Sequence, residues 1–222
     1  MKNRYTHNLV AINQLLINLN PGNRGLANIM ALEFAKIYKT GLNVLEIGCG
    51  EGDSALPVLE QTTAVIRLLD ESPEMISLAQ ERLSSFSGRT LFTCEDALSY
   101  LKSAHSNNII FSVQVIHNFT WPDKIQLLQE IYKNLRIGGY FLWVDKIYPD
   151  EGAQDLFNKQ MRRYSYLEKE DEIAMVQHET EDYLDDYRMD ESRVLTTLSE
   201  VGFKTIELID RFERDVLFIA QK

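Results

Sequence analysis

Apolar residues recur along the chain with two different periods, and the period changes near residue 41. Residues 6–19 and 26–38 repeat apolar side chains at spacings of three and four, which predicts two helices. The NPGN sequence between them, residues 20–23, predicts a break. Gly41 suits the glycine that follows a helix C-terminus. We therefore expect residues 1–40 to form an N-terminal helical cap.

Short apolar runs then alternate with helical patterns as far as residue 149. Strands are predicted for five runs: residues 43–48, 63–70, 90–96, 108–115 and 140–148. Helices are predicted for the segments between them: residues 53–62, 72–86, 97–103 and 121–135. Ser72 is followed by Pro73, a pair typical of a helix start. Because helices separate the strands, the pattern indicates a parallel sheet with right-handed crossovers.

The pattern changes again after residue 149. Residues 150–192 are rich in charge and show no strand pattern, so we expect an acidic helical insert or lid there. A helical pattern then ends at Gly202, and the last twenty residues are typical of two strands joined by a tight turn near residues 212–215. Residues 193–222 are thus expected to complete the sheet of a core that spans residues 41–149.

Composition favours one α/β domain with additions. The chain has 222 residues, 45% of them hydrophobic, and a formal net charge of −10. Between residues 148 and 192, fourteen acidic residues accompany five basic ones. An acidic surface repels a polyanion, which disfavours a nucleic-acid partner. The acidic stretch is either a solvated face or a rim that attracts a cationic substrate or partner.

The sequence also bears on the compartment. Its apolar stretches are shorter than the roughly 20 residues that span a bilayer, and Asn and Gln interrupt the apolar part of residues 1–20, so neither a membrane span nor a signal peptide is predicted. Cys49 and Cys94 would end strands that flank a third one, about 10 Å apart and too far for a disulfide. We expect reduced thiols and a cytoplasmic location.

Three glycines, Gly48, Gly50 and Gly52, follow the first predicted strand at every second position. A glycine-rich loop between a strand and a helix lets the backbone approach a ligand and directs helix N-terminal N–H groups at it. The spacing differs from the G-x-G-x-x-G of dinucleotide sites, and Asp53, which would repel a pyrophosphate, stands where that pattern has glycine. A plain tight turn is the alternative.

Acidic residues lie at or near the ends of three consecutive predicted strands. Glu46 lies within the first strand, Asp70 ends the second and Asp96 ends the third. In a parallel sheet these ends face one crevice, which is where such folds bind ligands. Asp70 is suited to accept two hydrogen bonds from a ribose diol, whereas Asp96 could instead cap the helix that begins at Ala97.

These motifs resemble those of the class I, Rossmann-like S-adenosylmethionine-dependent methyltransferases. VLEIGCGEGDSAL, residues 44–56, is similar to the first motif of that family, E/D-x-G-x-G-x-G, and residues 68–83 and 94–98 are similar to the second and third. FSVQVIHNF, the LRIGG turn and the closing hairpin extend the match. The resemblance implies an α/β, doubly wound, mostly parallel seven-stranded sheet of order 3-2-1-4-5-7-6, with the last strand antiparallel and helices on both faces.

The resemblance also implies S-adenosyl-L-methionine as cofactor and S-adenosyl-L-homocysteine as product. The loop from Gly48 to Gly52 would approach the methionine part, Glu46 would bind near its amino group or order the loop, and Asp70 would hold the ribose hydroxyls. Met75 and Asp96 would contact the adenine, and the residues after the fourth strand would line the sulfonium. The remaining positions implied to bind the cofactor are Glu71, Ala97, Val113 and Gln114.

Methyl transfer is an in-line displacement, so the protein must align the acceptor and exclude water, and it needs a general base only if the acceptor loses a proton. His117, just past the fourth strand, and Asp145, at the end of the fifth, are the catalytic candidates. His117 could instead shape the pocket, and Lys146 could pair with Asp145. His178 lacks partners at a metal-ligand spacing and is expected at the surface, so no metal is predicted.

We expect a small-molecule acceptor and no membrane contact. A homodimer is an assembly that the sequence allows. Three alternatives remain. A nicotinamide dehydrogenase is disfavoured by the glycine spacing and the closing hairpin. NFT, KIYP and YSYLE resemble carboxy-S-adenosylmethionine synthases, which act in tRNA wobble-uridine modification and hold a carboxylated cofactor with cationic residues, although KEDEIAM after YSYLE is mainly acidic. A non-catalytic S-adenosylmethionine-binding regulator is the third.

Overall fold

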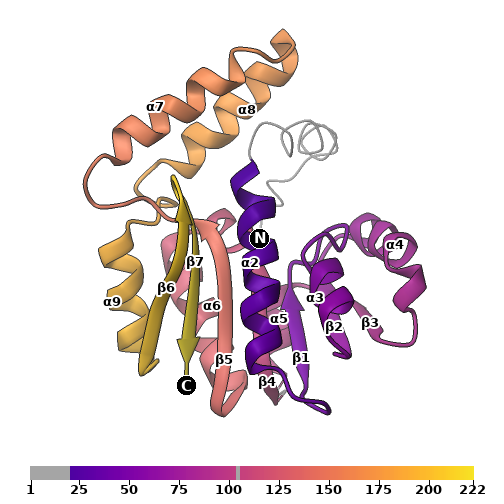
Figure 1. Ribbon diagram of the computed structural model, residues 1–222. Coiled ribbons are helices and arrows are strands. Elements are labelled where there is room, and N and C mark those ends of the chain that lie inside the picture. The colour runs from indigo at the N-terminus through magenta and orange to yellow at the C-terminus, as the bar shows by residue number, and fades with distance from the viewer. Residues whose placement is uncertain (1–20, 104–105) are drawn as a thin grey trace.

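A computed structural model describes residues 21–103 and 106–222; the expected helix over residues 6–19 lies outside this range. Within it, seven strands form one sheet in the order β3-β2-β1-β4-β5-β7-β6 (Figure 1). The strands are β1 (Val44–Ile47), β2 (Ile66–Asp70), β3 (Thr90–Cys94), β4 (Asn107–Val113), β5 (Leu135–Lys146), β6 (Thr205–Phe212) and β7 (Asp215–Gln221). Strands β1 to β5 pair in parallel, and β7 is antiparallel to β5 and β6. The predicted fold class is confirmed.

Helices cover both faces of the sheet, because each helix turns one apolar stripe toward it. Helices α2 (Pro21–Ile37), α3 (Ala55–Gln61) and α4 (Pro73–Arg82) contribute to one buried cluster, which includes Phe34, Val58 and Ala79. Helices α5 (Ala97–Lys102), α6 (Trp121–Asn134) and α9 (Glu191–Val201) contribute to a second cluster on the other face. Figure 1 shows α2 and α6 on opposite sides of the sheet.

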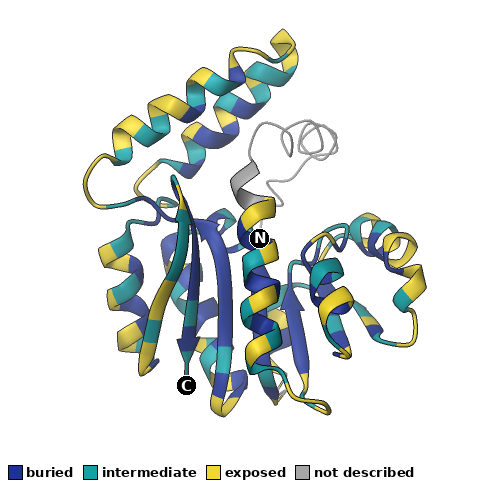
Figure 2. Ribbon diagram, viewed as in Figure 1, coloured by how far each residue is buried: buried dark blue, intermediate teal, exposed yellow. Residues whose placement is uncertain are grey.

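Two helices of the acidic segment form a hairpin beyond the carboxyl end of β5. They are α7 (Ala153–Tyr164) and α8 (Lys169–Asp182), and Figure 1 shows them projecting from the body of the molecule. Exposed and half-buried residues alternate along most of both helices (Figure 2). Their own buried apolar cluster consists of Tyr164 and Met175, so apolar packing alone is a weak link between the hairpin and the sheet.

The local boundaries follow the expected chemistry, with two differences. Ser72 caps α4, since its hydroxyl accepts a hydrogen bond from the Met75 amide at 3.3 Å. Helix α2 begins at Pro21, inside the expected break, because proline is tolerated in a first helical turn. Gly41 lies four residues beyond the end of that helix and forms a turn with a φ of 87°, so it is not the helix-terminating glycine we predicted. In the described residues no helix is both long and apolar enough to cross a bilayer.

Candidate functional site

The glycine loop (residues 48–52) is tied to the end of β2 by backbone hydrogen bonds. The amides of Gly48 and Cys49 donate to the Leu69 carbonyl at 2.7 and 3.0 Å. The Gly50 amide donates to Asp70 Oδ2 at 2.9 Å. The turn between β1 and α3 is therefore held in one conformation by the neighbouring strand.

The three glycines of this loop have different surroundings, although all have positive φ. A Cβ on Gly48 would lie 2.4 Å from Val115 Cγ2, and one on Gly52 would lie 2.9 Å from Leu83 Cδ1. A Cβ on Gly50 would meet no atom within 4 Å among the described residues. The protein's own packing thus accounts for the missing side chains at two positions, whereas the third exposes backbone to open space where a ligand can approach.

Glu46 is buried beside this loop with one oxygen that has no partner. Ser54 donates its hydroxyl to Oε1, whereas Oε2 has no hydrogen bond within the described part of the chain. Burial raises the pKa of Glu46 to about 8, and the charges of Asp70 and Asp53 add to the shift. An unpaired buried carboxylate oxygen is costly, so the site suits a ligand that carries an ammonium group.

Asp70 holds the loop and keeps capacity for a ligand. Its Oδ1 accepts from the Ser72 amide at 2.9 Å while Oδ2 accepts from Gly50. A carboxylate offers about four lone-pair positions, so both oxygens can accept further hydrogen bonds. Burial raises the pKa of Asp70. Glu71, the next residue in the chain, is exposed. Met75 is half-buried in the first turn of α4.

The ends of β3 and β4 complete this edge of the sheet. Asp96 caps α5 through Oδ1, which accepts from the Ser99 amide at 2.9 Å, so the capping interpretation is confirmed; both Asp96 and Ala97 are half-buried. Gln114, after Val113, has a φ of 58°, and its Nε2 donates to Asp215 Oδ1 at 3.1 Å. Left-handed backbone at a residue other than glycine costs about 1–2 kcal/mol. The predicted cofactor residues therefore lie at the carboxyl ends of four adjacent strands.

His117 and Asp145 form a buried pair. His117 Nδ1 lies 2.6 Å from Asp145 Oδ1. Asp145 also accepts from the Ile116, His117 and Lys146 amides at 2.8, 3.2 and 2.9 Å and from Trp143 Nε1 at 2.9 Å. Burial opposes ionisation of Asp145, but His117 and these donors outweigh it and lower its pKa. Asp145 is therefore a fixed, ionised carboxylate that orients the imidazole, and its oxygens are engaged too fully for it to serve as a base.

Charged side chains from β5, from α8 and from the turn before β7 form a buried ionic cluster, which consists of Lys146, Glu179, Asp182 and Arg214. Lys146 Nζ donates to Asp182 at 2.7 Å and to Glu179 at 3.2 Å. Arg214 Nη2 donates to Glu179 at 2.8 Å. The expected pairing of Lys146 with Asp145 is wrong, because the lysine side chain reaches α8 instead. The acidic stretch is also more than a solvated face, since Glu179 and Asp182 are 1% and 4% exposed.

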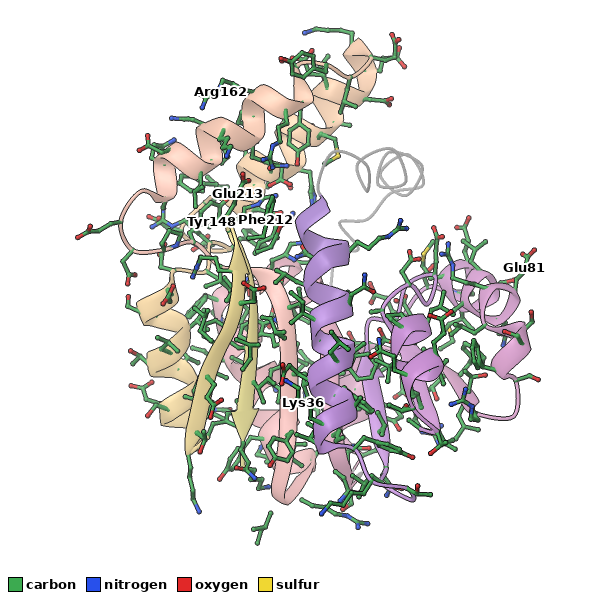
Figure 3. The ribbon with its side chains drawn as sticks, in the orientation of Figure 1. Lys36, Glu81, Tyr148, Arg162, Phe212 and Glu213 are labelled. Carbon is green, nitrogen blue, oxygen red and sulfur yellow. The ribbon has the colours of Figure 1, made fainter. Side chains whose placement is uncertain are left out.

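The ionic cluster joins the α7–α8 hairpin to the ends of β5 and β7. Tyr148, after β5, receives a hydrogen bond from Arg214 Nη1 at 2.9 Å, and Tyr164 of α7 donates to Glu179 at 2.8 Å. Figure 3 shows Tyr148 and Glu213 where the strands meet the hairpin, with Arg162 on α7. The sheet and the hairpin are thus linked through charge, and also through ring contacts of Tyr183 with Tyr148 and Phe157.

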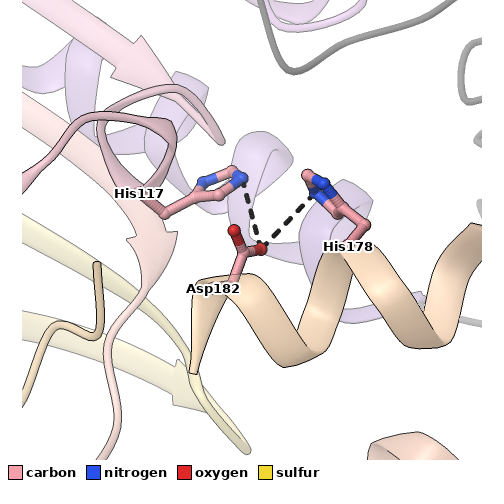
Figure 4. Close-up of side chains that lie close together, drawn as sticks. All are labelled: His117, His178 and Asp182. Carbon is pink, nitrogen blue, oxygen red and sulfur yellow. Dashed lines mark ion pairs between the residues drawn. The ribbon is translucent and has the colours of Figure 1, made fainter. Parts of the chain in front are cut away.

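His178 is buried, which contradicts the predicted surface position. Its side chain is 7% exposed, and its ring centroid lies 6.4 Å from that of His117. His178 Nε2 and His117 Nε2 lie 3.5 and 4.0 Å from Asp182 Oδ2 (Figure 4). The prediction failed because this face of α8 packs against His117, which follows β4, and against Lys146 at the end of β5. The spacing of four between His178 and Asp182, which places both on one helix face, is the signal that was overlooked.

Known proteins are similar to this one over the core alone and over most of the chain. Residues 44–139 match a family model described as a methyltransferase domain. A carboxy-S-adenosyl-L-methionine synthase from Helicobacter pylori (strain HPAG1) is 29% identical over 210 residues, covering 89% of this chain and 84% of that protein. A protein of the same name from Campylobacter lari is 26% identical over 228 residues, covering 98% and 86%.

Solved structures with low identity share the fold. One is a putative O-methyltransferase from Nostoc punctiforme, with a TM-score of 0.68 and 17% identity. The match covers 92% of this chain and 58% of that one. Another is PigF with S-adenosylhomocysteine (SAH; TM-score 0.60, 15% identity), with 53% of that chain and 85% of this one covered. The [4+2]-cyclase SpnF is also similar (TM-score 0.59, 18% identity, 58% and 84% covered). The chain spans slightly more than half the length of these proteins.

Proposed function

Because the chain belongs to the class I S-adenosylmethionine-dependent methyltransferase family, we propose that it binds S-adenosylmethionine along the carboxyl ends of β1 to β4 and transfers a one-carbon group from it. The observation that carries this proposal is the buried Glu46 Oε2, which has no hydrogen-bond partner in the part of the chain that the structure describes and lies beside the open backbone of Gly50. The cofactor has an ammonium group to pair with that oxygen.

The other strand ends suit the rest of the cofactor. Asp70, which keeps lone pairs after binding two amides, accepts from the ribose hydroxyls, with Glu71 beside it. The adenine would be held between Met75 and the start of α5, where the second oxygen of Asp96, the N-cap of that helix, would accept from its amino group. Val113 and Gln114 would lie near the sulfonium. Each charge-assisted hydrogen bond contributes about 1.5–3 kcal/mol when water is excluded.

His117 is the residue that we assign to interact with the acceptor. The Nδ1 contact with Asp145 leaves the lone pair of Nε2 available, either to accept a proton from an acceptor or to hold a cation that polarises it. Asp145 is a positioning residue that fixes the tautomer. Methyl transfer to a small-molecule acceptor, with release of S-adenosylhomocysteine, is the reaction we assign.

A second candidate is synthesis of carboxy-S-adenosylmethionine, which the name of the curated relatives favours. That product carries a carboxylate near the sulfonium and needs a cation to hold it. Lys146 and Arg214 are the cations of the ionic cluster beside this edge, and both are paired with acids of α8. Methyl transfer therefore remains the first assignment.

The two reactions leave different products. Purified protein is incubated with isotope-labelled S-adenosylmethionine and fractions of a small-molecule extract, and the products are separated by mass spectrometry. The proposal predicts S-adenosylhomocysteine and a labelled acceptor. A cofactor heavier by one carbon dioxide, without S-adenosylhomocysteine, would establish the second candidate, and binding without any conversion would indicate a regulatory protein.

Asp70→Ala tests the cofactor assignment independently of the acceptor. Loss of the ribose hydrogen bonds and of the loop anchor is expected to weaken S-adenosylmethionine binding by about 10- to 100-fold, measured by calorimetry. Asp155→Ala, in the first turn of α7, is the matched control. Equal affinities of the Asp70 variant and the unaltered protein would rule out the ribose assignment. A melting-temperature increase with NAD as large as that with S-adenosylmethionine would instead contradict the choice of cofactor.

A further inference from the structure

We propose that His117, His178 and Asp182 form a binding site for a divalent first-row transition metal. The two imidazoles and the carboxylate come from the segment after β4 and from one face of α8, and their ligand atoms all lie within 4.8 Å of one another. The site itself is defined by these three side chains. Only the role of the metal in the reaction rests on the proposed function.

The distances are close to those of a coordination sphere. Zinc–ligand bonds of 2.0–2.1 Å in a tetrahedron separate neighbouring donor atoms by about 3.4 Å. Asp182 Oδ2 lies 3.5 Å from His178 Nε2 and 4.0 Å from His117 Nε2. Small side-chain rotations would bring the three atoms to bonding distance of one ion.

The surroundings of His117 match those of a metal-bound histidine. Ligating histidines usually donate their second ring N–H to a carboxylate, which fixes the tautomer. His117 has this contact, 2.6 Å from Nδ1 to Asp145. Its Nε2 is buried, the side chain being 3% exposed, and has no hydrogen-bond partner among the described residues. A buried lone pair directed at a second imidazole and a carboxylate is costly without a cation.

The donor set indicates the class of metal. Two imidazoles and one carboxylate are donors that suit zinc and iron(II) better than magnesium.

Carboxylates flank the His117 imidazole on both sides, since Asp145 contacts Nδ1 and Asp182 Oδ2 lies 4.0 Å from Nε2. Such surroundings favour a cation. Lys146 is the direct competitor of the metal, because its Nζ donates to the same Asp182 oxygen at 2.7 Å. Its second partner, Glu179 at 3.2 Å, can retain it when a metal binds. Open coordination positions would then take an oxygen of the acceptor and favour its deprotonation, which points to hydroxyl acceptors.

The test is a metal titration without cofactor. Chelator-stripped full-length protein is titrated with Co²⁺, followed by visible absorption, and with Zn²⁺, followed by calorimetry, with Mg²⁺ for comparison. One saturable Co²⁺ or Zn²⁺ site is expected. His178→Ala and Asp182→Asn should abolish it, Asp145→Asn should weaken it about 10- to 100-fold, and Lys146→Met should tighten it. Gln177→Ala, on the exposed side of α8, is the matched control and should bind unchanged.

X-ray absorption of the unaltered protein with bound Co²⁺ avoids any dependence on variants that fold poorly, and two imidazole ligands are expected. Absence of saturable binding, fewer than two imidazoles, or affinity unchanged in both His178→Ala and Asp182→Asn would overturn the site. S-adenosylmethionine binding is measured separately on stripped protein. Failure there alone would overturn the proposed function and leave the metal site standing.

Discussion

The two halves of the carboxyl edge of the sheet are held together by different kinds of interaction. Around the glycine loop, backbone amides and single acids hold the chain, and one buried oxygen of Glu46 has no hydrogen-bond partner among residues 21–103 and 106–222. At the ends of β4 and β5, side chains of the ionic cluster bind one another across long sequence separations. The first half is shaped to receive a ligand with a positive charge, whereas the second half already contains the cations and anions that join the hairpin to the sheet.

The largest effect is expected from breaking the ionic cluster. Glu179→Ala leaves Lys146 and Arg214 buried without their shared partner, which should lower the free energy of unfolding by about 3–5 kcal/mol. Urea denaturation measures it. Glu172→Ala, whose partner Lys169 is exposed, should cost less than about 1 kcal/mol. Similar costs for the two variants would mean that the cluster does not secure the hairpin.

Glycine substitutions separate packing from ligand access. Gly48→Ala places a methyl group 2.4 Å from Val115, so it should lower the free energy of unfolding by about 1–3 kcal/mol, and Val115→Ala should restore part of that loss. Gly50→Ala meets open space and should cost about 1–2 kcal/mol through its positive φ. It should nevertheless impair S-adenosylmethionine binding. Normal cofactor affinity in Gly50→Ala would show that no ligand approaches this backbone.

A further effect is a pH dependence from Glu46. Its pKa is raised from 4.5 to about 8, so the folded, ligand-free protein holds this proton between those values while the unfolded chain does not. The contribution of Glu46 to stability is therefore full below pH 4.5 and falls as the pH rises toward 8. Pairing with an ammonium group requires the ionised form, so cofactor affinity should rise with pH up to about 8. Calorimetry between pH 6 and 9 measures this, and Glu46→Gln should flatten the profile.

Much of the fold could be predicted because its signals are local. Periodicity, Ser72 with Pro73, and Gly202 mark helices and strands within a few residues, and the acids at strand ends follow from the parallel topology. The glycine loop was also visible, but the sequence could not reveal that Val115 and Leu83 occupy the space beside two of its glycines.

The second half of the edge could not be predicted in the same way. Lys146 forms ion pairs with Glu179 and Asp182, which are 33 and 36 residues away in the sequence, and no motif in α8 predicts this contact. Charge patterning left a solvated face and a rim for a cationic substrate or partner as the two interpretations, since acids at such spacings usually face water. The position of His178 depends on how the hairpin docks, which is a tertiary property. Its spacing from Asp182 was the one local sign.

The most direct test of the account is the affinity of S-adenosylmethionine for the unaltered protein and for Glu46→Gln at pH 8, measured by calorimetry with Glu60→Gln, an exposed acid on α3, as control. The account predicts binding that Glu46→Gln weakens by about 10- to 100-fold and Glu60→Gln leaves unchanged. No binding to the unaltered protein at millimolar concentration, or equal affinity for all three proteins, would contradict it.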